Sequence, residues 1–328
     1  MKKLEPRTGF DMKLHQLKAL TMVADCGSIR AAARSLGISQ TAAAKAILEL
    51  EQQVQLPLVH RNARGISLTE YGNSLLQHAR QVISQLERAE LELAHLSNQA
   101  EGHLRLGISP WMALTFLPEA VMLFRQRMPK VRLEIFEGLM AVTLPRLRDG
   151  TMELAVGLVS ASLPRPEFTC DAIFEYEMAV VARHGHPLGN SRSIHELVEQ
   201  DWVLNYPDSS HDQVMTEIFW QHGAEIEVSR IQRAQSVQLM LTLTEQTEML
   251  SYFPKPILAS NMYSDRVRCL ELNESFATDL IGIVTPRNNL LGAAAQCFVD
   301  CLYQVIRRRA RSSNPKDASL FDTLSLLV

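Results

Sequence analysis

One stretch near the N-terminus constrains the fold more than any other: residues 27–51 read GSIRAAARSLGISQTAAAKAILELE. Ser28 is a favourable N-cap before an alanine-rich run, Gly37 ends that run, and Ser39 caps a second helix that extends to about Val54. Two helices joined by a short glycine-containing turn form a helix-turn-helix. The stretch therefore predicts an element that binds DNA.

The side chains of these two helices fit that arrangement. Small residues at positions 31–33 allow close approach, and four apolar side chains are expected to fix the crossing of the helices: Leu36, Ile38, Ile47 and Leu50. The outward face of the second helix presents short or hydrogen-bonding groups: Gln40, Thr41, Ala44 and Lys45. Such groups at a helix N-terminus suit contact with base edges in a major groove.

The flanking segments complete a winged domain. Apolar residues at helical spacing from Leu14 predict a supporting first helix. Pro57 ends the helical part, and Leu58–Thr69 is predicted to form a hairpin with Gly65 at its turn. Arg61 and Arg64 flank the tip, where they are placed to reach phosphate or a minor groove. The alternative is that both arginines are ordinary surface residues.

A long helix is predicted from Thr69 to about residue 98. Its apolar residues recur at alternating steps of four and three, which is an unbroken heptad seam: Leu75, Ala79, Val82, Leu86, Ala89, Leu93 and Leu96. Such a seam predicts pairing with the same helix of a second chain, which would join two helix-turn-helix domains in one dimer. The alternative is an amphipathic helix that packs on its own chain.

Residues after 101 alternate strands and helices. Expected strands are 103–108, 131–138, 153–159, 176–183, 201–206, 230–235, 248–254, 267–272 and 280–286, and expected helices are 114–127, 143–149, 193–198, 236–244 and, last, 290–309. Near-continuous apolar strands separated by helices predict an α/β fold with a parallel sheet covered on both faces.

The head of the chain resembles the DNA-binding domain of LysR-type transcriptional regulators. The resemblance covers residues 14–69 and includes the SQxAxxxxIxxLE pattern at Ser39–Glu51, followed by LPLVHRNARGISLTEYG, which is similar to the family's LFxR…LTxxG wing. Thr41 stands where the family usually has Pro, and Ala43 and Ala44 where it often has Leu and Ser. These departures suggest a shifted base preference.

The rest of the chain resembles the effector-binding domain of the same family, which is similar in fold to periplasmic solute-binding proteins. Pro6, Thr8 and Gly9 break any regular pattern at the N-terminus, which predicts an unstructured extension (1–11). The resemblance implies a winged helix-turn-helix (12–69), a dimerising linker helix (70–98) and a two-lobed effector domain (101–312), followed by a tail (313–328). Lobe 1 is expected at about 103–175 and 280–310, and lobe 2 at about 176–279. Met12 is an alternative start, and the tail either folds back or docks on a neighbouring subunit.

Two sets of site residues follow. DNA contacts are assigned to Arg30, Arg34, Ser39, Gln40, Thr41, Lys45, Arg61 and Arg64. Effector contacts are assigned near the carboxyl ends of strands and across the cleft: Ser109, Trp111, Met112, Leu139, Val159, His211 and Thr247. Ser109 either caps a helix, grips an acidic group, or does both. Thr247 and Met249 replace glycines that the family commonly has, so a narrower pocket is expected.

Charge and composition support a cytoplasmic DNA-binding protein. Residues 1–70 contain ten Lys and Arg against six Asp and Glu, a net +4, whereas the other residues contain 23 against 30, a net −7. A basic N-terminal region in an otherwise acidic chain is expected if only the N-terminal region contacts DNA phosphates. No apolar run is long enough to span a bilayer, and MKKLEPRTGF is not a secretory signal.

The sequence shows no catalytic or metal-binding pattern. It has no Walker, GxSxG or HExxH motif, and its five cysteines do not form a disulfide framework. Cys297 and Cys301 are a poor zinc site without further ligands. We therefore expect no enzyme activity and no cofactor. The one conceivable catalytic pair is Ser109 as nucleophile with His211 as general base. Neither an acid partner nor an oxyanion motif accompanies these two residues.

The resulting hypothesis is a LysR-type regulator of promoter DNA. Its partners are double-stranded DNA, a small effector, expected to be a carboxylate, and further copies of itself as a homodimer and homotetramer, with no membrane. Two alternatives stay open: a solute-processing enzyme with a DNA-binding appendage, and a nonspecific architectural DNA-binding protein. Turnover of a ligand would favour the first, and equal affinity for promoter and random DNA the second.

Overall fold

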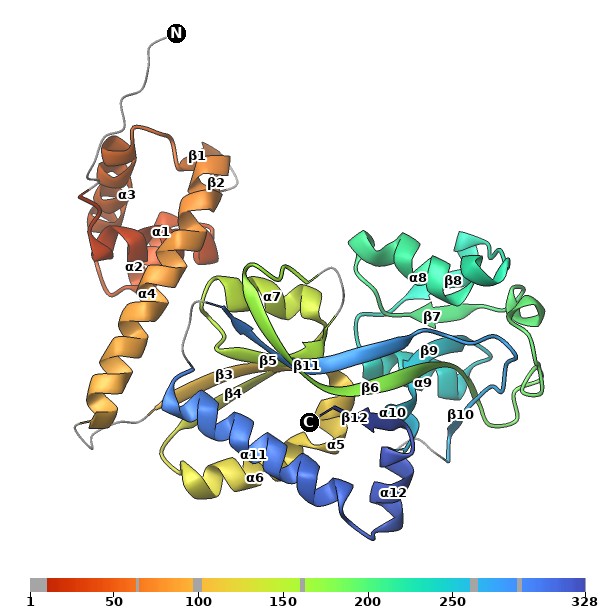
Figure 1. Cartoon of the computed structure of the whole chain (residues 1–328). Helices are drawn as coiled ribbons and strands as arrows, with labels where there is room; N and C mark the ends of the chain where they lie inside the picture. Colours follow the sequence, from red (N-terminus) through yellow and green to blue (C-terminus); the bar gives the residue numbers. More distant parts are fainter. Residues whose placement is uncertain are drawn as a thin grey trace. The chain divides into compact units, whose positions relative to one another are not determined.

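The computed structural model describes residues 11–62, 65–96, 102–159, 163–259, 265–287 and 291–327, with the backbone alone at residues 61, 62, 65, 87, 88 and 91–96. The predicted extension at 1–11 therefore falls, except for Asp11, outside the described residues. The chain divides into two compact units, and the main boundary falls between residues 101 and 102 (Figure 1).

The first unit has the winged helix-turn-helix order of elements. It contains α1 (Leu14–Cys26), α2 (Ile29–Ser35), α3 (Gln40–Val54), β1 (Val59–Asn62), β2 (Gly65–Leu68) and α4 (Glu70–Leu96). The predicted caps are confirmed: Ser28 Oγ accepts from Ala31 N–H and Ser39 Oγ from Ala42 N–H, both at 3.1 Å. Gly37 adopts φ +65°, a left-handed conformation that glycine reaches without strain and that ends α2.

The core of this unit differs from expectation at one residue. Leu20, Ile47 and Leu50 are fully buried, and Leu36 packs against them. Ile38, which was expected to help fix the helix crossing, is instead 42% exposed. Its N–H bonds to Ala33 O and closes the turn after Gly37, so its side chain leaves the inner face before α3 begins.

The second unit alternates strands and helices. It contains β3 (His103–Ile108), α5 (Pro110–Thr115), α6 (Leu117–Arg127), β4 (Arg132–Glu137), α7 (Met140–Arg148), β5 (Leu154–Leu158), β6 (Phe168–Arg183), η1 (Ile194–Leu197), β7 (Trp202–Leu204), η2 (Asp208–Ser210), α8 (His211–Ile218), η3 (Trp220–His222), η4 (Val228–Arg230), β8 (Ile231–Arg233), α9 (Val237–Gln246), β9 (Leu250–Pro254), α10 (Lys255–Ala259), β10 (Val267–Cys269), β11 (Thr278–Pro286), α11 (Ala293–Ala310), α12 (Pro315–Phe321) and β12 (Leu324–Leu326).

The sheet order explains how two lobes share one chain. The strands run β4-β3-β5-β11-β6-β9-β7-β8, with β10 and β12 also paired to β6. The pairs β3–β4, β3–β5, β7–β8 and β7–β9 are parallel, whereas β11 is antiparallel to both β5 and β6. The expected parallel sheet is therefore mixed, because the two strands that cross between the lobes run in opposite directions.

Strand β6 is the longer of the two crossing strands. It runs unbroken through the predicted lobe boundary at residues 175 and 176, pairing first with β11 and then with β9 and β10. Figure 1 shows α6 and α11 on one side of the sheet formed by β3, β4 and β5, and α7 on the other. One apolar cluster extends from lobe 1 past the crossing strands into lobe 2, where it includes Val203, Met240 and Phe253, and a second cluster lies within lobe 2.

Two predicted helices differ from the observed ones in more than their end residues. The helix expected at 114–127 is divided into α5 and α6 at Phe116, and Pro118 lies in the first turn of α6. Proline lacks an N–H and favours a helix start, which accounts for the break. The helix expected at 290–309 is α11, and it is not the last one, because α12 follows.

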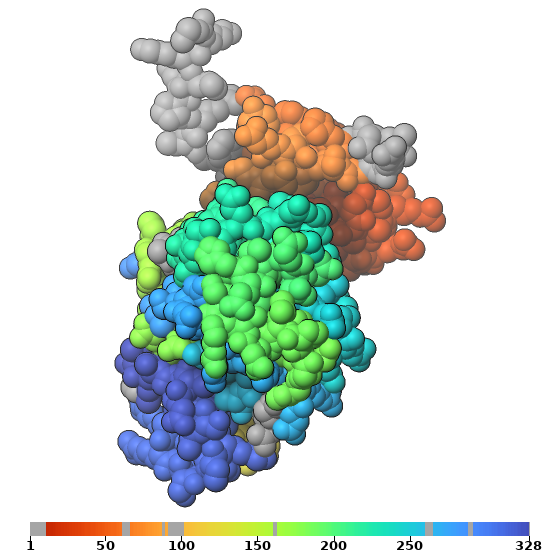
Figure 2. All heavy atoms as spheres, turned by 90° about the vertical axis from the view of Figure 1, so that its right-hand side faces the viewer, coloured from red at the N-terminus to blue at the C-terminus, as the bar shows by residue number. Residues whose placement is uncertain are grey.

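The C-terminal tail folds back on its own domain. Strand β12 pairs with residues 174–176 of β6, and the ring of Phe321 in α12 packs against Phe116 and Phe174 at centroid distances of 6.0 Å. Arg309 Nε donates to Asp317 Oδ1 at 2.6 Å and fixes the start of α12. In Figure 2 the C-terminal residues, in dark blue, are continuous with the rest of the domain. The fold-back alternative is therefore the one observed.

Within the ranges that the structure describes, no helix combines the length and the hydrophobicity that crossing a membrane requires.

Candidate functional site

The exposed face of α3 carries the polar residues that the sequence assigned to DNA. Gln40, Thr41 and Lys45 are exposed, as are Arg30 and Arg34 on α2. Lys45 Nζ lies 3.7 Å from Glu49 Oε1, and its side chain is 75% exposed, so the ion pair leaves the ammonium accessible. The buried face of α3 carries Ala43, Ala46, Ile47 and Leu50.

Ser39 has a structural role that constrains its use in binding. Its Oγ accepts from Ala42 N–H and lies 3.2 Å from Thr41 Oγ1. The capping hydrogen bond fixes the hydroxyl at the first turn of α3. Any contact of Ser39 with DNA must therefore use its remaining hydrogen-bonding capacity.

The wing forms the predicted hairpin. Val59 pairs with Leu68 and Asn62 with Gly65 across β1 and β2. Arg61 belongs to β1, but its side chain and the whole of Arg64 lie outside the described residues. The assignment of both arginines to DNA stays a prediction.

Three residues that the sequence assigned to no site fix the wing to its neighbours. Glu51 Oε1 accepts from Leu58 N–H at 2.8 Å and from Val59 N–H at 3.2 Å, which ties the end of α3 to the start of the wing. Thr69 Oγ1 donates to Pro57 O and accepts from Gly72 N–H, which ties the end of the wing to α4. The LE and LTxxG patterns contain Glu51, Thr69 and Gly72, and spacing alone gave no partner for them.

The second unit contains a cavity of about 420 Å³. Its lining comes from both lobes and from the crossing strands: Ser109, Pro110, Trp111, Gly138, Leu139, Met140, Ala141, Leu144, Gly157, Leu158, Leu163, Tyr176, Met178, Leu204, Asn205, Tyr206, Pro207, Ser209, Ser210, Gln213, Val214, Glu217, Val237, Met240, Tyr252, Phe253, Pro254, Ile257 and Asp279. This volume lies within the range of about 300–1,000 Å³ that small-molecule sites occupy.

Three residues from the predicted effector set line this cavity: Ser109, Trp111 and Leu139. Ser109 precedes α5 in an extended conformation, but its hydroxyl makes no capping hydrogen bond. Its Oγ is buried and has no hydrogen-bond partner among the described residues, and neither has the buried Nε1 of Trp111. The side chain of Trp111 is only 2% exposed. Buried polar atoms are nearly always hydrogen-bonded, so both atoms are available to a ligand.

The other four predicted effector residues do not line the cavity. Met112 is fully buried in the core beneath α5, and Val159 is buried after β5. His211 begins α8, where its Nδ1 lies 3.1 Å from Tyr206 Oη, so it supports a lining residue. Thr247 caps α9 by donating from Oγ1 to Leu243 O, so the expected narrowing at Thr247 does not occur in this cavity.

Sequence reasoning also missed an acidic and phenolic cluster in the same lining. Asp279 on β11 is paired in register with Tyr176 on the neighbouring β6, and Tyr252 Oη on β9 donates to Glu217 Oε1 on α8 at 2.7 Å. Burial and the nearby Glu217 carboxylate raise the pKa of Asp279 to about 6, against a hydrogen bond with Tyr176 that lowers it. Burial likewise raises the pKa of Glu217.

Nothing in the sequence pattern brings these four residues together. Glu217 was not expected to be helical, and Asp279 immediately precedes the predicted strand 280–286. An acidic residue beside an apolar strand was the one available signal. It is too common to have singled out Asp279.

The cysteines and metal ligands of the described chain suggest no second centre. Burial raises the pKa of the Cys170 and Cys269 thiols, and burial together with Cys297 raises that of Cys301 to about 11. A thiol must ionise to react or to bind metal, so these are poorly activated. Within the described ranges, no three His, Cys, Asp or Glu side chains are grouped as metal ligands.

Two family models match most of the chain. Residues 14–73 match the bacterial regulatory helix-turn-helix protein of the lysR family, and residues 97–307 match the LysR substrate binding domain. The HTH-type transcriptional regulator TdcA of Escherichia coli is 24% identical over 88% of this chain and 91% of its own length. The SDS degradation transcriptional activation protein of a Pseudomonas species is 27% identical over 87% of this chain and 94% of its own.

Solved structures share the fold. A full-length OxyR variant from Pseudomonas aeruginosa covers 91% of this chain and 96% of its own at a TM-score of 0.63 and 16% identity. Full-length CbnR complexed with its target DNA covers 90% of this chain and 100% of its own at a TM-score of 0.60 and 19% identity. The helix-turn-helix, the cavity-bearing α/β unit and both family models agree: the chain belongs to the LysR family and is a transcriptional regulator with a DNA-binding and an effector-binding domain.

Proposed function

We propose that this regulator works in the cytoplasm, binds a two-fold-related promoter site, and changes its promoter engagement when a small molecule with an acidic group occupies the cavity. The observation that carries the proposal is the pair of unsatisfied donors, Ser109 Oγ and Trp111 Nε1, in the lining of that cavity. A regulatory ligand must bind two arrangements of the protein with different affinity. A cavity lined from both lobes suits that requirement.

Base and phosphate contacts are assigned to α2, α3 and the wing. Gln40, Thr41 and Lys45 would meet base edges from the first turns of α3, with Ser39 at its cap. Arg30, Arg34, Arg61 and Arg64 would contact phosphate or a minor groove. The exposure of the residues on α2 and α3 supports this assignment.

The linker helix α4 is assigned to pairing with its copy. Val82 and Leu86 are 51% and 39% exposed, although they lie in the heptad seam. Leu75, nearer the start of the seam, packs on the helix-turn-helix core, so the seam is shared between the domain and the proposed dimer contact. The side chains of Leu93 and Leu96 lie outside the described residues. A dimer of such dimers would give the proposed tetramer.

The acidic group of the effector is assigned to the Ser109 end of the cavity. The first residues of α7 and α9 line the same space, and Ser210 lies directly before α8. Backbone N–H groups at helix starts favour an anion. These helix starts and the Ser109 hydroxyl all belong to the lining of one cavity, which supports a carboxylate as its ligand.

The test is a footprint of the purified protein on the DNA that flanks its own gene, with and without a panel of small carboxylic acids. Protection of two spaced half-sites that changes with one acid is the expected result. Equal protection of promoter and random DNA at matched salt would instead favour an architectural protein. The absence of protection at every salt concentration would refute the regulatory function.

Replacing Lys45 by Ala is expected to weaken binding to the footprinted DNA by about tenfold and to reduce its salt dependence, because one accessible cation is lost. Titration of labelled DNA at several salt concentrations measures both quantities. Lys316→Ala, an exposed lysine of the second unit, serves as the matched control. Unchanged affinity for the Lys45 variant would remove that residue from the contact set.

Replacing Ser109 by Met is expected to abolish the response of the footprint to any responsive acid, because the larger side chain fills the cavity and the hydroxyl is lost. Footprints at increasing acid concentration, compared with those of the exposed Ser229→Met variant, measure the effect. DNA binding without acid reports whether the variant is folded. A response that persists would move the effector site away from Ser109.

A further inference from the structure

The cavity contains negative as well as hydrogen-bond-donating groups. Glu217 and Asp279 both line it, and neither makes an ion pair with a described residue. Among the described residues that line the cavity there is no Lys, Arg or His. Carboxylates that are partly removed from water usually have a cationic partner, because removing a charge from water is costly. The described lining thus contains an acidic pair without the cation that would satisfy it.

The acidic pair belongs to a defined cluster. Asp279 and Tyr176 are register partners on the crossing strands β11 and β6. Glu217 lies on α8 and accepts a hydrogen bond from Tyr252 on β9. The ring of Trp111 on α5 packs edge-on against Tyr176 at a centroid distance of 5.4 Å. Three segments of the fold therefore meet at one end of the ligand space: the hinge strands, lobe 2 and α5.

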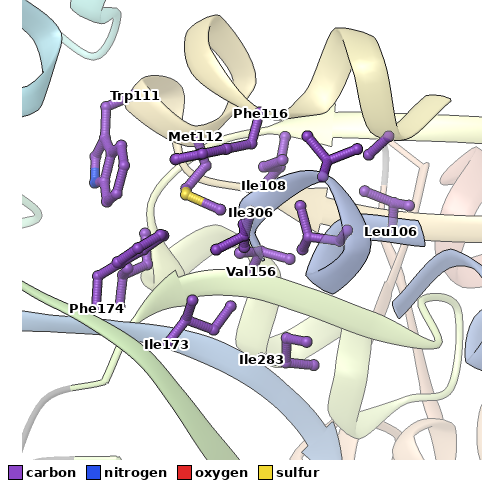
Figure 3. Packing of buried hydrophobic residues seen from close by; sticks show 14 of the residues in the cluster. Leu106, Ile108, Trp111, Met112, Phe116, Val156, Ile173, Phe174, Ile283 and Ile306 are labelled. Carbon is purple, nitrogen blue, oxygen red and sulfur yellow. The ribbon is translucent and has the colours of Figure 1, made fainter. Parts of the chain in front are cut away.

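A second observation points to a ligand at the same place. Trp111 is 2% exposed, and its Nε1 makes no hydrogen bond of standard geometry with a described residue, although the indole N–H lies close enough to the Tyr176 phenol to offset part of the rise in its pKa. In Figure 3 the indole nitrogen lies on the side of the ring that faces away from the labelled core residues. The donor is thus directed away from the packed core, on a residue that lines the cavity. A ligand acceptor would satisfy it.

We propose that the effector carries a protonated amine as well as an acidic group, so that it is a zwitterion of the amino-acid class with an apolar body. The amine is held by Glu217 and Asp279, beside the phenols of Tyr176 and Tyr252. The acidic group meets Ser109 Oγ and Trp111 Nε1. The apolar body contacts Leu139, Leu144, Leu158, Met178, Met240 and Ile257. This inference rests on the proposed role of the cavity as the effector site.

The amine also gives a physical link to lobe closure. Asp279 lies on a crossing strand, whereas Glu217 lies on α8 of lobe 2. Two carboxylates without a cation repel each other, and this repulsion contributes to the raised pKa of Asp279. An ammonium between them replaces repulsion with two charge-assisted hydrogen bonds. Ligand binding would then favour the arrangement in which lobe 2 and the hinge strands are close.

The binding should depend on pH in a defined direction. Asp279 faces Tyr176, Tyr252 and Glu217 and has a pKa of about 6, whereas an aliphatic amine stays protonated throughout pH 5–8. As pH falls through 6, Asp279 gains a proton and loses its attraction for the amine. The affinity for an amino acid should therefore be lower at pH 5 than at pH 7.5, and the affinity for the matched acid should not fall in this way.

The experiment uses the full-length protein and matched sets of probes. Leucine, methionine, phenylalanine and 6-aminohexanoate are each compared with the acid that lacks the amine and the amine that lacks the acid, by calorimetry and by footprint. MgCl₂ and CaCl₂ are tested alone. At least one amino acid is expected to bind about 10- to 100-fold more tightly than either of its partial analogues.

Substitution of the acidic pair tests the assignment directly. Glu217→Gln and Asp279→Asn are each expected to weaken amino-acid binding by about 10- to 100-fold, with much smaller effects on the matched acid. The exposed Glu225→Gln and Asp212→Asn are the matched controls. Asp279→Asn should also raise the Tm of the ligand-free protein more at pH 7.5 than at pH 5, because its raised pKa means that the ionised form destabilises the fold as pH rises through 6.

Each other outcome has a defined meaning. Acids that bind as tightly as amino acids, binding of Mg²⁺ or Ca²⁺ alone, or unchanged affinity in both acidic variants would overturn the amine proposal. A footprint that still responds to acids would then leave the proposed function intact. Amino acids that bind without changing the footprint would support the amine site and contradict its regulatory role. No binding by any probe would overturn both.

Discussion

Replacing Val82 and Leu86 together by Asp should lower the affinity of the protein for its two-half-site DNA by about 10²- to 10⁴-fold, which is the range that linkage of two binding modules supplies. Both side chains are exposed in the single chain, at neighbouring positions of one face of α4. Charges at both positions of an apolar pairing surface would have to be buried without partners. The two DNA-binding domains would then bind their half-sites as separate monomers.

Sedimentation of the purified variant and titration of the footprinted DNA measure this result. Asn73→Asp together with Gln77→Asp is the matched control, because it adds the same charge at the same spacing on exposed positions outside the seam. A variant that stays dimeric would show that α4 does not pair through this face. A monomeric variant with unchanged affinity for the DNA would show that the two DNA-binding domains do not bind it jointly.

Replacing Gly72 by Ala should destabilise the winged domain by about 3 kcal/mol, at the upper end of the usual overpacking range. A Cβ at position 72 would lie 2.0 Å from Leu58 O, a backbone atom that also accepts a hydrogen bond from Thr69 N–H. Because no flexible side chain can move aside, either the wing or the start of α4 must shift. Glu51 and Thr69 would lose the geometry with which they hold the wing.

Thermal unfolding followed by circular dichroism, together with DNA titration, tests this prediction. The midpoint temperature of the first unfolding transition and the affinity for DNA are both expected to fall, since the wing and α3 share the Glu51 contact. Asn73→Ala, one position further in the same turn and exposed, should change neither quantity appreciably. An unchanged first transition for Gly72→Ala would show that the wing is not fixed at this contact.

Local chemistry accounts for the parts of the fold that could be predicted. Ser28 and Ser39 cap their helices whatever lies around them, and Gly37 ends α2 because glycine adopts its left-handed conformation without strain. The hairpin and the long linker helix likewise follow from turn residues and apolar periodicity. Ile38 was misplaced because a residue in a tight turn follows no helical period.

The candidate effector site could be predicted in part. Ser109, Trp111 and Leu139 follow strands whose carboxyl ends meet at one edge of the sheet, so a general rule placed them at the cavity. Met112 and Val159 lie next to such residues but point into the core, because one step along the chain reverses or rotates the side chain. A position near the end of a strand was therefore not sufficient to predict which residues line the cavity.

The amino-acid sequence by itself determined the helix-turn-helix, the wing, the linker helix and the alternating strands and helices of the second unit, because caps, turns and apolar spacing act over a few residues. Only the tertiary structure decided that the tail folds back on β6 and that Glu217 meets Asp279 in one cavity. These contacts join segments far apart in the chain. They depend on the path of the crossing strands, which local sequence does not encode.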